Sequence, residues 1–168
     1  MRTAIFIIMS LTLSMSGFNG PVTEINDRGD TRWYSLKKAQ KLAETDEKKV
    51  LVYLYANNSN ECRKMTYRVY ASEKVSEIIH KHFYAAKINA NTDKNVTFNG
   101  KEISIDEFIS TFNVDAYPTI IFLDSKGETI TLQGGFIEPE TFNKLLVFIG
   151  SDAYKRQEFD QFTYQREN

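Results

Sequence analysis

The segment 50–55 constrains the fold of this chain more than any other part of its sequence. It consists of six apolar or aromatic residues in succession, Val-Leu-Val-Tyr-Leu-Tyr, with no charged residue between them. A strand with one face in water alternates apolar and polar residues, so an unbroken run predicts a strand that is buried on both faces. Because helices must then cover both faces of the sheet, this segment predicts an α/β fold.

Other apolar patterns predict the elements around this strand. Further strands are expected at 83–88 and 119–123, and the turn 124–127 predicts a hairpin whose returning strand runs from 128 to 133. Apolar residues at helical spacing predict five helices, which contain residues 36–43, 62–69, 72–82, 105–112 and 139–149. The order of these elements predicts a parallel β-α-β half followed by an antiparallel hairpin, in one mixed sheet with helices on both faces.

Two stretches carry weaker signals. Segment 89–101 is polar, and Asn99–Gly100 predicts a turn within it. The tail from Asp152 places Tyr154 and Phe159 among charged residues, and we expect it to pack as a last short helix.

The length of 168 residues fits one domain with short extensions, and 42% hydrophobic residues are enough to bury a core. We divide the chain into a signal peptide (1–17), a linker (18–31), an α/β domain (32–150) and a C-terminal helical extension (151–168). The first 17 residues are typical of an export signal.

Arg2 supplies a positive charge, and residues 4–13 form a nearly uninterrupted apolar run. Ser14-Met15-Ser16 then offers the small residues that a signal peptidase accepts. The run is too short to span a bilayer, which takes about 20 residues. We therefore expect a periplasmic or secreted protein with no membrane span after signal cleavage.

Charge and histidine placement argue against two classes of ligand. Charged residues make up 26% of the chain and balance to a net charge of −1, which gives no reason to expect binding to nucleic acid. His80 and His82 are two positions apart on a predicted helix, so their side chains do not face each other. We expect no metal site and no cofactor.

Cys62 is the only cysteine in the sequence. Exported proteins normally use cysteines in pairs, and a single one is either a free thiol or a partner in an intermolecular bond. No disulfide can form within this chain.

These features together resemble the thioredoxin superfamily. The resemblance covers residues 33–150 and is most similar to exported thioredoxin-related proteins, including the periplasmic kind found with sulfur-oxidation systems. It implies a thioredoxin-like fold, with a central mixed sheet flanked by helices and a C-terminal helical extension. The matching segments are 50–56, Cys62-Arg63-Lys64-Met65, Tyr117-Pro118-Thr119 and Gly134.

The resemblance also shows where the reactive loop departs from the family pattern. In the family, a cysteine at a helix N-terminus attacks as a thiolate and a second cysteine one turn later resolves the mixed disulfide. Here Ser59 takes the place of the attacking cysteine and Cys62 that of the resolving one. Asn58 replaces the usual tryptophan, Glu61 the usual proline, and Tyr53 the buried acid. Stoichiometry therefore excludes one-step dithiol exchange.

The family resemblance implies a cis peptide bond between Tyr117 and Pro118, opposite the loop. This bond would leave a backbone edge free to hold an extended peptide. A plain strand-entry proline is the alternative interpretation.

Ser59 and Cys62 each allow two interpretations. Ser59 could act as a nucleophile, which needs an activating base, or it could cap the following helix. Cys62 could exchange with glutathione or form a mixed disulfide with a partner, or it could be a buried, inert side chain.

The leading hypothesis is an exported protein that binds protein or peptide partners, with at most monothiol redox activity at Cys62. Two alternatives stay open. One is a thiol–disulfide oxidoreductase of thioredoxin type that uses an external thiol as its second cysteine, and the other is a non-catalytic scaffold subunit of an envelope complex. The expected binding residues are Tyr117, Pro118, Asn58, Asn60 and Glu61.

Overall fold

The computed structural model describes residues 31–163 of the chain. The signal-peptide prediction and nearly all of the linker prediction lie outside these residues. The strands are β1 (Trp33–Tyr34), β2 (Lys49–Tyr55), β3 (Phe83–Asn89), β4 (Asn95–Phe98), β5 (Lys101–Ser104), β6 (Thr119–Leu123) and β7 (Thr129–Gly134). The helices are α1 (Leu36–Asp46), α2 (Asn60–Lys64), the π-helical η1 (Met65–Tyr70), α3 (Glu73–His82), α4 (Ile105–Thr111) and α5 (Pro139–Gly150), followed by the 3₁₀ turns η2 (Ala153–Lys155) and η3 (Phe159–Gln161).

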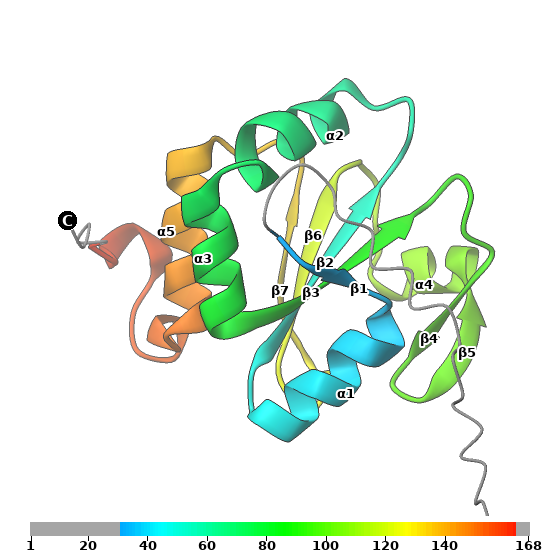
Figure 1. Cartoon of the computed structure of the whole chain (residues 1–168), viewed down its shortest axis with the longest axis horizontal. Coiled ribbons are helices and arrows are strands. Elements are labelled where there is room, and N and C mark those ends of the chain that lie inside the picture. Colours follow the sequence, from blue (N-terminus) through cyan, green and yellow to red (C-terminus); the bar gives the residue numbers. More distant parts are fainter. Residues whose placement is uncertain (1–30, 164–168) are drawn as a thin grey trace, which may run out of the picture.

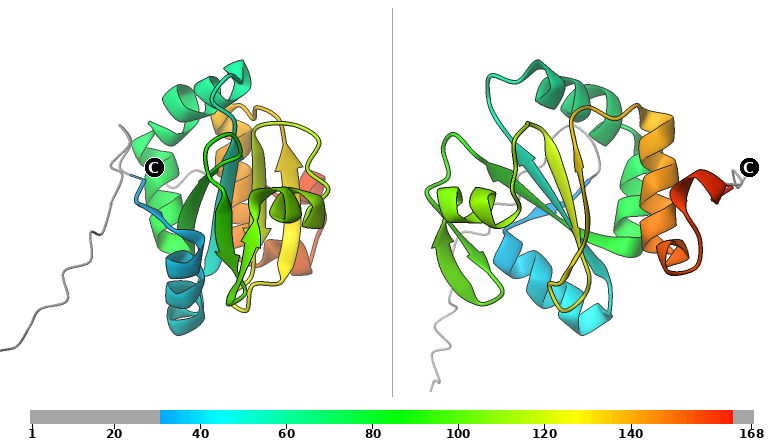
Figure 2. Two further views of the ribbon diagram at one scale, coloured as in Figure 1. Left: turned by 90° about the vertical axis from the view of Figure 1, so that its right-hand side faces the viewer. Right: turned by 180° about the vertical axis from the view of Figure 1, so that it is seen from behind.

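Five strands form one sheet in the order β1-β3-β2-β6-β7. Strand β2 pairs in parallel with β3 and antiparallel with β6, and β6 pairs antiparallel with β7. Helices lie on both faces of this sheet (Figure 1; Figure 2 gives two further views). The predicted α/β fold with a mixed central sheet is therefore confirmed.

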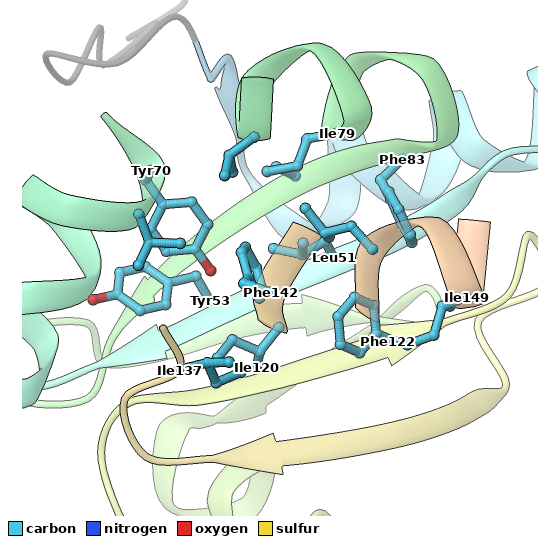
Figure 3. Close-up of a cluster of buried hydrophobic side chains, with 14 of the residues drawn as sticks. Leu51, Tyr53, Tyr70, Ile79, Phe83, Ile120, Phe122, Ile137, Phe142 and Ile149 are labelled. Atoms are coloured by element: carbon cyan, nitrogen blue, oxygen red, sulfur yellow. The ribbon is translucent and has the colours of Figure 1, made fainter. Parts of the chain in front are cut away.

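Strand β2 lies at the centre of the sheet and divides the core into two clusters. Residues 50–54 are at most 1% exposed. Leu51 and Tyr53 point to the face covered by α3 and α5, where Phe122 and Phe142 also lie (Figure 3). Alternate residues of β2 point to the other face, which α1 and α4 cover. Both faces are dry, as the unbroken apolar run predicts.

The polar segment 89–101 contains part of a hairpin that its sequence does not predict. Strands β4 and β5 pair antiparallel as a separate two-stranded sheet around Asn99–Gly100. Both turn residues have positive φ, 47° and 79°, as a two-residue hairpin turn requires. Only one face of the hairpin is apolar: Phe98 packs its ring 5.7 Å from that of Phe108. A four-residue strand with one wet face leaves too little apolar pattern to identify from sequence.

The tail forms the two 3₁₀ turns η2 and η3 where a last short helix is expected. Phe159 and Phe162 pack against Phe148 of α5, with ring centroids 5.4 and 5.3 Å away. These contacts hold the tail against the outer side of α5. Within residues 31–163, no helix has the length and apolar character that crossing a membrane requires.

Helices α3 and α5 meet at a contact that depends on a glycine. A Cβ atom added at Gly150 would lie 2.6 Å from Cγ and 2.7 Å from Cβ of His82. These atoms are close to the backbone of α3, so the histidine cannot simply swing away.

We predict that Gly150→Ala destabilises the protein by about 1–3 kcal/mol, the usual cost of overpacking, although replacing glycine by alanine in a helix normally stabilises it. Urea unfolding of the wild type and the variant measures this difference. In the double variant His82→Ala/Gly150→Ala the loss should be smaller than the sum of the two single losses. Strict additivity would show that the His82–Gly150 contact is not the cause.

Candidate functional site

The candidate site lies where β2 ends and the chain turns into α2. Ala56 is buried directly after the strand, while Asn57 and Asn58 are exposed. Ser59 is half-buried and is the N-cap residue of α2. The central, fully buried strand therefore delivers a short polar loop to the surface and fixes its starting point.

The hydroxyl of Ser59 makes two hydrogen bonds that join separate parts of the chain. Its Oγ accepts from the backbone N–H of Cys62 at 3.1 Å, which caps α2. The same hydroxyl donates to the carbonyl oxygen of Tyr117, also at 3.1 Å. Serine is among the best N-cap residues because its oxygen satisfies a first-turn N–H group. Here it also ties the loop to the Tyr117–Pro118 segment.

This arrangement leaves the Ser59 hydroxyl without an activating base. Its proton is directed at a backbone carbonyl, and both histidines lie at the opposite end of the sheet, beside the start of β2. His80 Nε2 accepts from the backbone N–H of Arg32 at 3.2 Å, and His82 packs against Gly150. A serine nucleophile needs a base within hydrogen-bond reach, so the geometry supports the capping role.

Cys62 is only 3% exposed and lies on the inner side of α2. Its Sγ accepts from the backbone N–H of Ala56 at 3.5 Å. The thiol therefore points back under the loop rather than toward solvent. A buried cysteine in such surroundings behaves as a small apolar side chain.

Tyr53 lies directly beneath α2, at the position where the family resemblance places a buried acid. Its hydroxyl donates to the carbonyl oxygen of Cys62 at 3.0 Å, and Thr66 Oγ1 donates to the same oxygen at 3.1 Å. Burial raises the pKa of Tyr53 well above its usual value. The tyrosine therefore stays protonated at neutral pH and acts as a fixed hydrogen-bond donor, not as a proton acceptor.

The Tyr117–Pro118 peptide bond is cis and lies beside the loop. Pro118 is buried, Tyr117 is half-buried against the α1/α4 cluster, and Asp115 and Ala116 are exposed. The carbonyl of Pro118 accepts from Gly135 N–H at 2.7 Å, which links this segment to the end of β7. Among the described residues, the N–H of Tyr117 has no hydrogen-bond partner.

The other predicted binding residues lie on the outer surface of the loop and of α2. Asn58 is exposed, and Asn60 is exposed and accepts a hydrogen bond from Arg63. Glu61 is half-buried and pairs with Lys64 at 2.9 Å. The structure thus joins Ser59 to Tyr117 by a hydrogen bond, whereas Asn58, Asn60 and Glu61 form no hydrogen bond with Tyr117 within residues 31–163.

An asparagine network supports the loop from below, and the sequence analysis did not identify it. Asn89 Nδ2 donates to Asn57 Oδ1 at 2.8 Å and to Tyr55 Oη at 3.2 Å. The backbone N–H of Asn57 donates to Asn91 Oδ1 at 2.7 Å. These bonds join the ends of the neighbouring strands β2 and β3. The signal for this network in the sequence is Asn89, a polar residue directly after the predicted strand 83–88.

The described part of the chain contains no group of three histidine, cysteine, aspartate or glutamate side chains that could hold a metal ion. The site therefore consists of a backbone segment at Tyr117–Pro118, a hydroxyl that holds it, and a buried thiol.

Comparison with known proteins agrees with this fold. A family model described as a thioredoxin-like domain matches residues 36–150. No curated protein is detectably similar in sequence. Two of the similar solved structures are a thioredoxin-fold protein from Helicobacter pylori (24% identity, 69% of this chain and 77% of that one, TM-score 0.62) and a thioredoxin from Thermus thermophilus (22%, 81% and 99%, 0.62). A third is a disulphide isomerase from Xylella fastidiosa (20%, 79% and 98%, 0.55). At these identities the likeness establishes the fold alone.

We predict that Ser59→Ala lowers the free energy of unfolding by about 2 kcal/mol, because it removes both a helix cap and a second hydrogen bond. The matched control is Ser104→Ala, since the Ser104 hydroxyl caps α4 through Glu107 N–H at 3.1 Å and makes no second bond within the described residues. That control should lose only about 1 kcal/mol. Equal losses in urea unfolding would mean that the bond to Tyr117 contributes nothing.

Proposed function

Since the chain belongs to the thioredoxin-like domain family, we propose that it binds extended segments of other proteins beside Tyr117–Pro118 and does so without dithiol–disulfide exchange. The observation that carries this proposal is the pair of hydrogen bonds made by the Ser59 hydroxyl. These bonds fix the loop at 56–59 through a hydroxyl group, which cannot take part in thiol–disulfide exchange.

The backbone around Tyr117 supports peptide binding. The N–H of Tyr117 has no partner among the described residues, and its carbonyl oxygen accepts only from Ser59, which leaves one lone pair. An extended peptide can pair with such a donor and acceptor through its own backbone, largely independently of its sequence. Exposed Asp115 and Ala116 on one side and Asn58 on the other leave the approach open.

The state of the thiol argues against catalysis with an external thiol. Exchange requires a thiolate that can meet a partner's sulfur in line, so the attacking sulfur must be accessible. Cys62 is 3% exposed and its sulfur is engaged by the Ala56 N–H. A monothiol role would need the loop to open first. A scaffold role would leave the free backbone groups of Tyr117 without a use.

We further propose that the protein works outside the cytoplasm. The support is the N-terminal pattern of Arg2, the apolar run 4–13 and the small residues at 14–16, which lie outside the described residues. Unfolded or extended protein segments are common partners for a binding protein in such a compartment.

The proposal is tested with reduced, carboxymethylated lysozyme, an unfolded chain that carries no free thiol. We expect the protein to bind it in a fluorescence-anisotropy assay. Tyr117→Ala should weaken binding by about threefold or more, because the tyrosine side chain packs against the α1/α4 cluster and holds the backbone groups of residue 117 in place. Tyr34→Ala is the matched control, because Tyr34 packs half-buried against the same α1/α4 cluster but lies on the edge strand β1, which β3 and β2 separate from β6.

Two results would contradict the proposal. One is equal weakening by both tyrosine substitutions, which would show a general effect on folding. The other is binding only to lysozyme with free thiols, which would return the function to thiol exchange.

A further inference from the structure

Strand β7 is the edge strand of the sheet on the side away from β1, and it pairs only with β6. Four of its side chains, Thr129, Thr131, Leu132 and Gln133, are exposed. In Figure 2 (right) the strand runs along the edge of the sheet beside α5. Its outer backbone groups are therefore available to a further strand, except that the Gly134 carbonyl already accepts from Gln133 Nε2 at 3.0 Å.

The sequence of β7 has none of the features that usually block such pairing. Thr-Ile-Thr-Leu-Gln-Gly contains no charged residue and no proline. Proteins normally protect an exposed edge with lysine, proline or a covering segment. Leu132 is 37% exposed and is one of two large hydrophobic side chains in the described structure that are exposed.

A groove with a volume of ≈ 570 Å³ lies directly beside this edge, between β7, α5 and the tail. Its β7 side consists of Ile130, Thr131 and Gln133. Aromatic and aliphatic side chains form much of its wall, including half-buried Phe136, Leu145 and Phe159. A strand added to β7 would direct every second side chain into this groove.

The charged side chains that line the groove are carboxylates, while cations lie over two of its aromatic rings: Arg68 over Phe136 at 5.3 Å and Lys144 over Phe159 at 4.6 Å. Two glutamates, Glu138 and Glu158, line it, and no lysine or arginine of the described residues does. Glu138 already pairs with Arg68 at 3.0 Å, whereas Glu158 is exposed and forms no ion pair within the described part of the chain. Glu158 therefore offers an unpaired carboxylate to a cation that flanks apolar side chains in the groove.

We propose that β7 and this groove form a second binding surface, which takes an extended, basic-apolar peptide segment of another protein as an additional strand. This surface is separate from the one beside Tyr117–Pro118 and goes beyond the proposed function. A second copy of this chain fits less well. In a β7–β7 pair, the second copy would direct threonine and glutamine side chains into the groove. The pair would also bring the groove glutamates of both copies close to each other.

The test uses a fluorescently labelled heptapeptide of sequence Lys-Thr-Val-Thr-Val-Thr-Lys. In an extended strand, the lysines and valines share one face. We expect it to bind the full chain about tenfold more tightly than the same peptide with glutamate at both ends. N-methylating one alternating set of its amides should abolish binding, whereas methylating the other set should not, because only one set faces β7.

Protein variants locate the surface. Thr131→Lys places a cation on the edge strand and in the groove, and we expect it to weaken the lysine peptide about tenfold. Thr97→Lys is the matched control, because β4 belongs to the separate two-stranded sheet. Neither variant alters Tyr117, so binding of carboxymethylated lysozyme reports on the proposed function independently.

Several outcomes would overturn the proposal. Equal loss of binding from both N-methylated sets, or equal effects of Thr131→Lys and Thr97→Lys, would exclude strand addition at β7. A dimer that Thr131→Lys dissociates would make a second copy the occupant. Binding that is gained only when residues 164–168 are removed would make the chain's own C-terminal end the occupant.

Discussion

The burial of β2 on both faces is the constraint on which the rest of the structure depends. Residues 50–54 are at most 1% exposed, and their side chains supply the centre of both core clusters. A strand in this position must have helices above and below it, and it must end where the protein meets solvent. The loop at 56–59 therefore emerges at a fixed place, directly beside the segment that enters β6. Figure 1 shows β2 in the middle of the sheet with helices on either side.

At that place the loop carries the Ser59 hydroxyl instead of a second thiol. Ser59 caps α2 and holds the Tyr117 carbonyl, while Cys62 lies beneath it with its carbonyl fixed by Tyr53 and Thr66. The groups joined by these four hydrogen bonds are all neutral. The result is a rigid backbone surface with a buried thiol, which suits recognition of a peptide backbone better than transfer of electrons.

The sequence predicts those parts of the fold that leave a periodic or compositional signal. The unbroken apolar run of β2 and the helical spacing of apolar residues in α1 and α5 are such signals. The hairpin of β4 and β5 leaves almost none, because each strand has four residues and one wet face. The bond from Ser59 to Tyr117 joins residues 58 positions apart, so it depends on strand order rather than on local pattern. The same holds for the Asn57–Asn89 contact and for the groove beside β7, which exist only once the sheet is assembled.

The central claim is that the site works by backbone recognition with an inaccessible thiol, and the rate of Cys62 alkylation tests it most directly. The measurement compares the folded protein with the urea-denatured chain from pH 6 to pH 9, using iodoacetamide and mass spectrometry. The account predicts strong protection in the folded state at every pH, with alkylation limited by opening or unfolding of the loop. A folded protein that is alkylated at pH 7 as fast as the denatured chain would contradict it and would make Cys62 a reactive thiol.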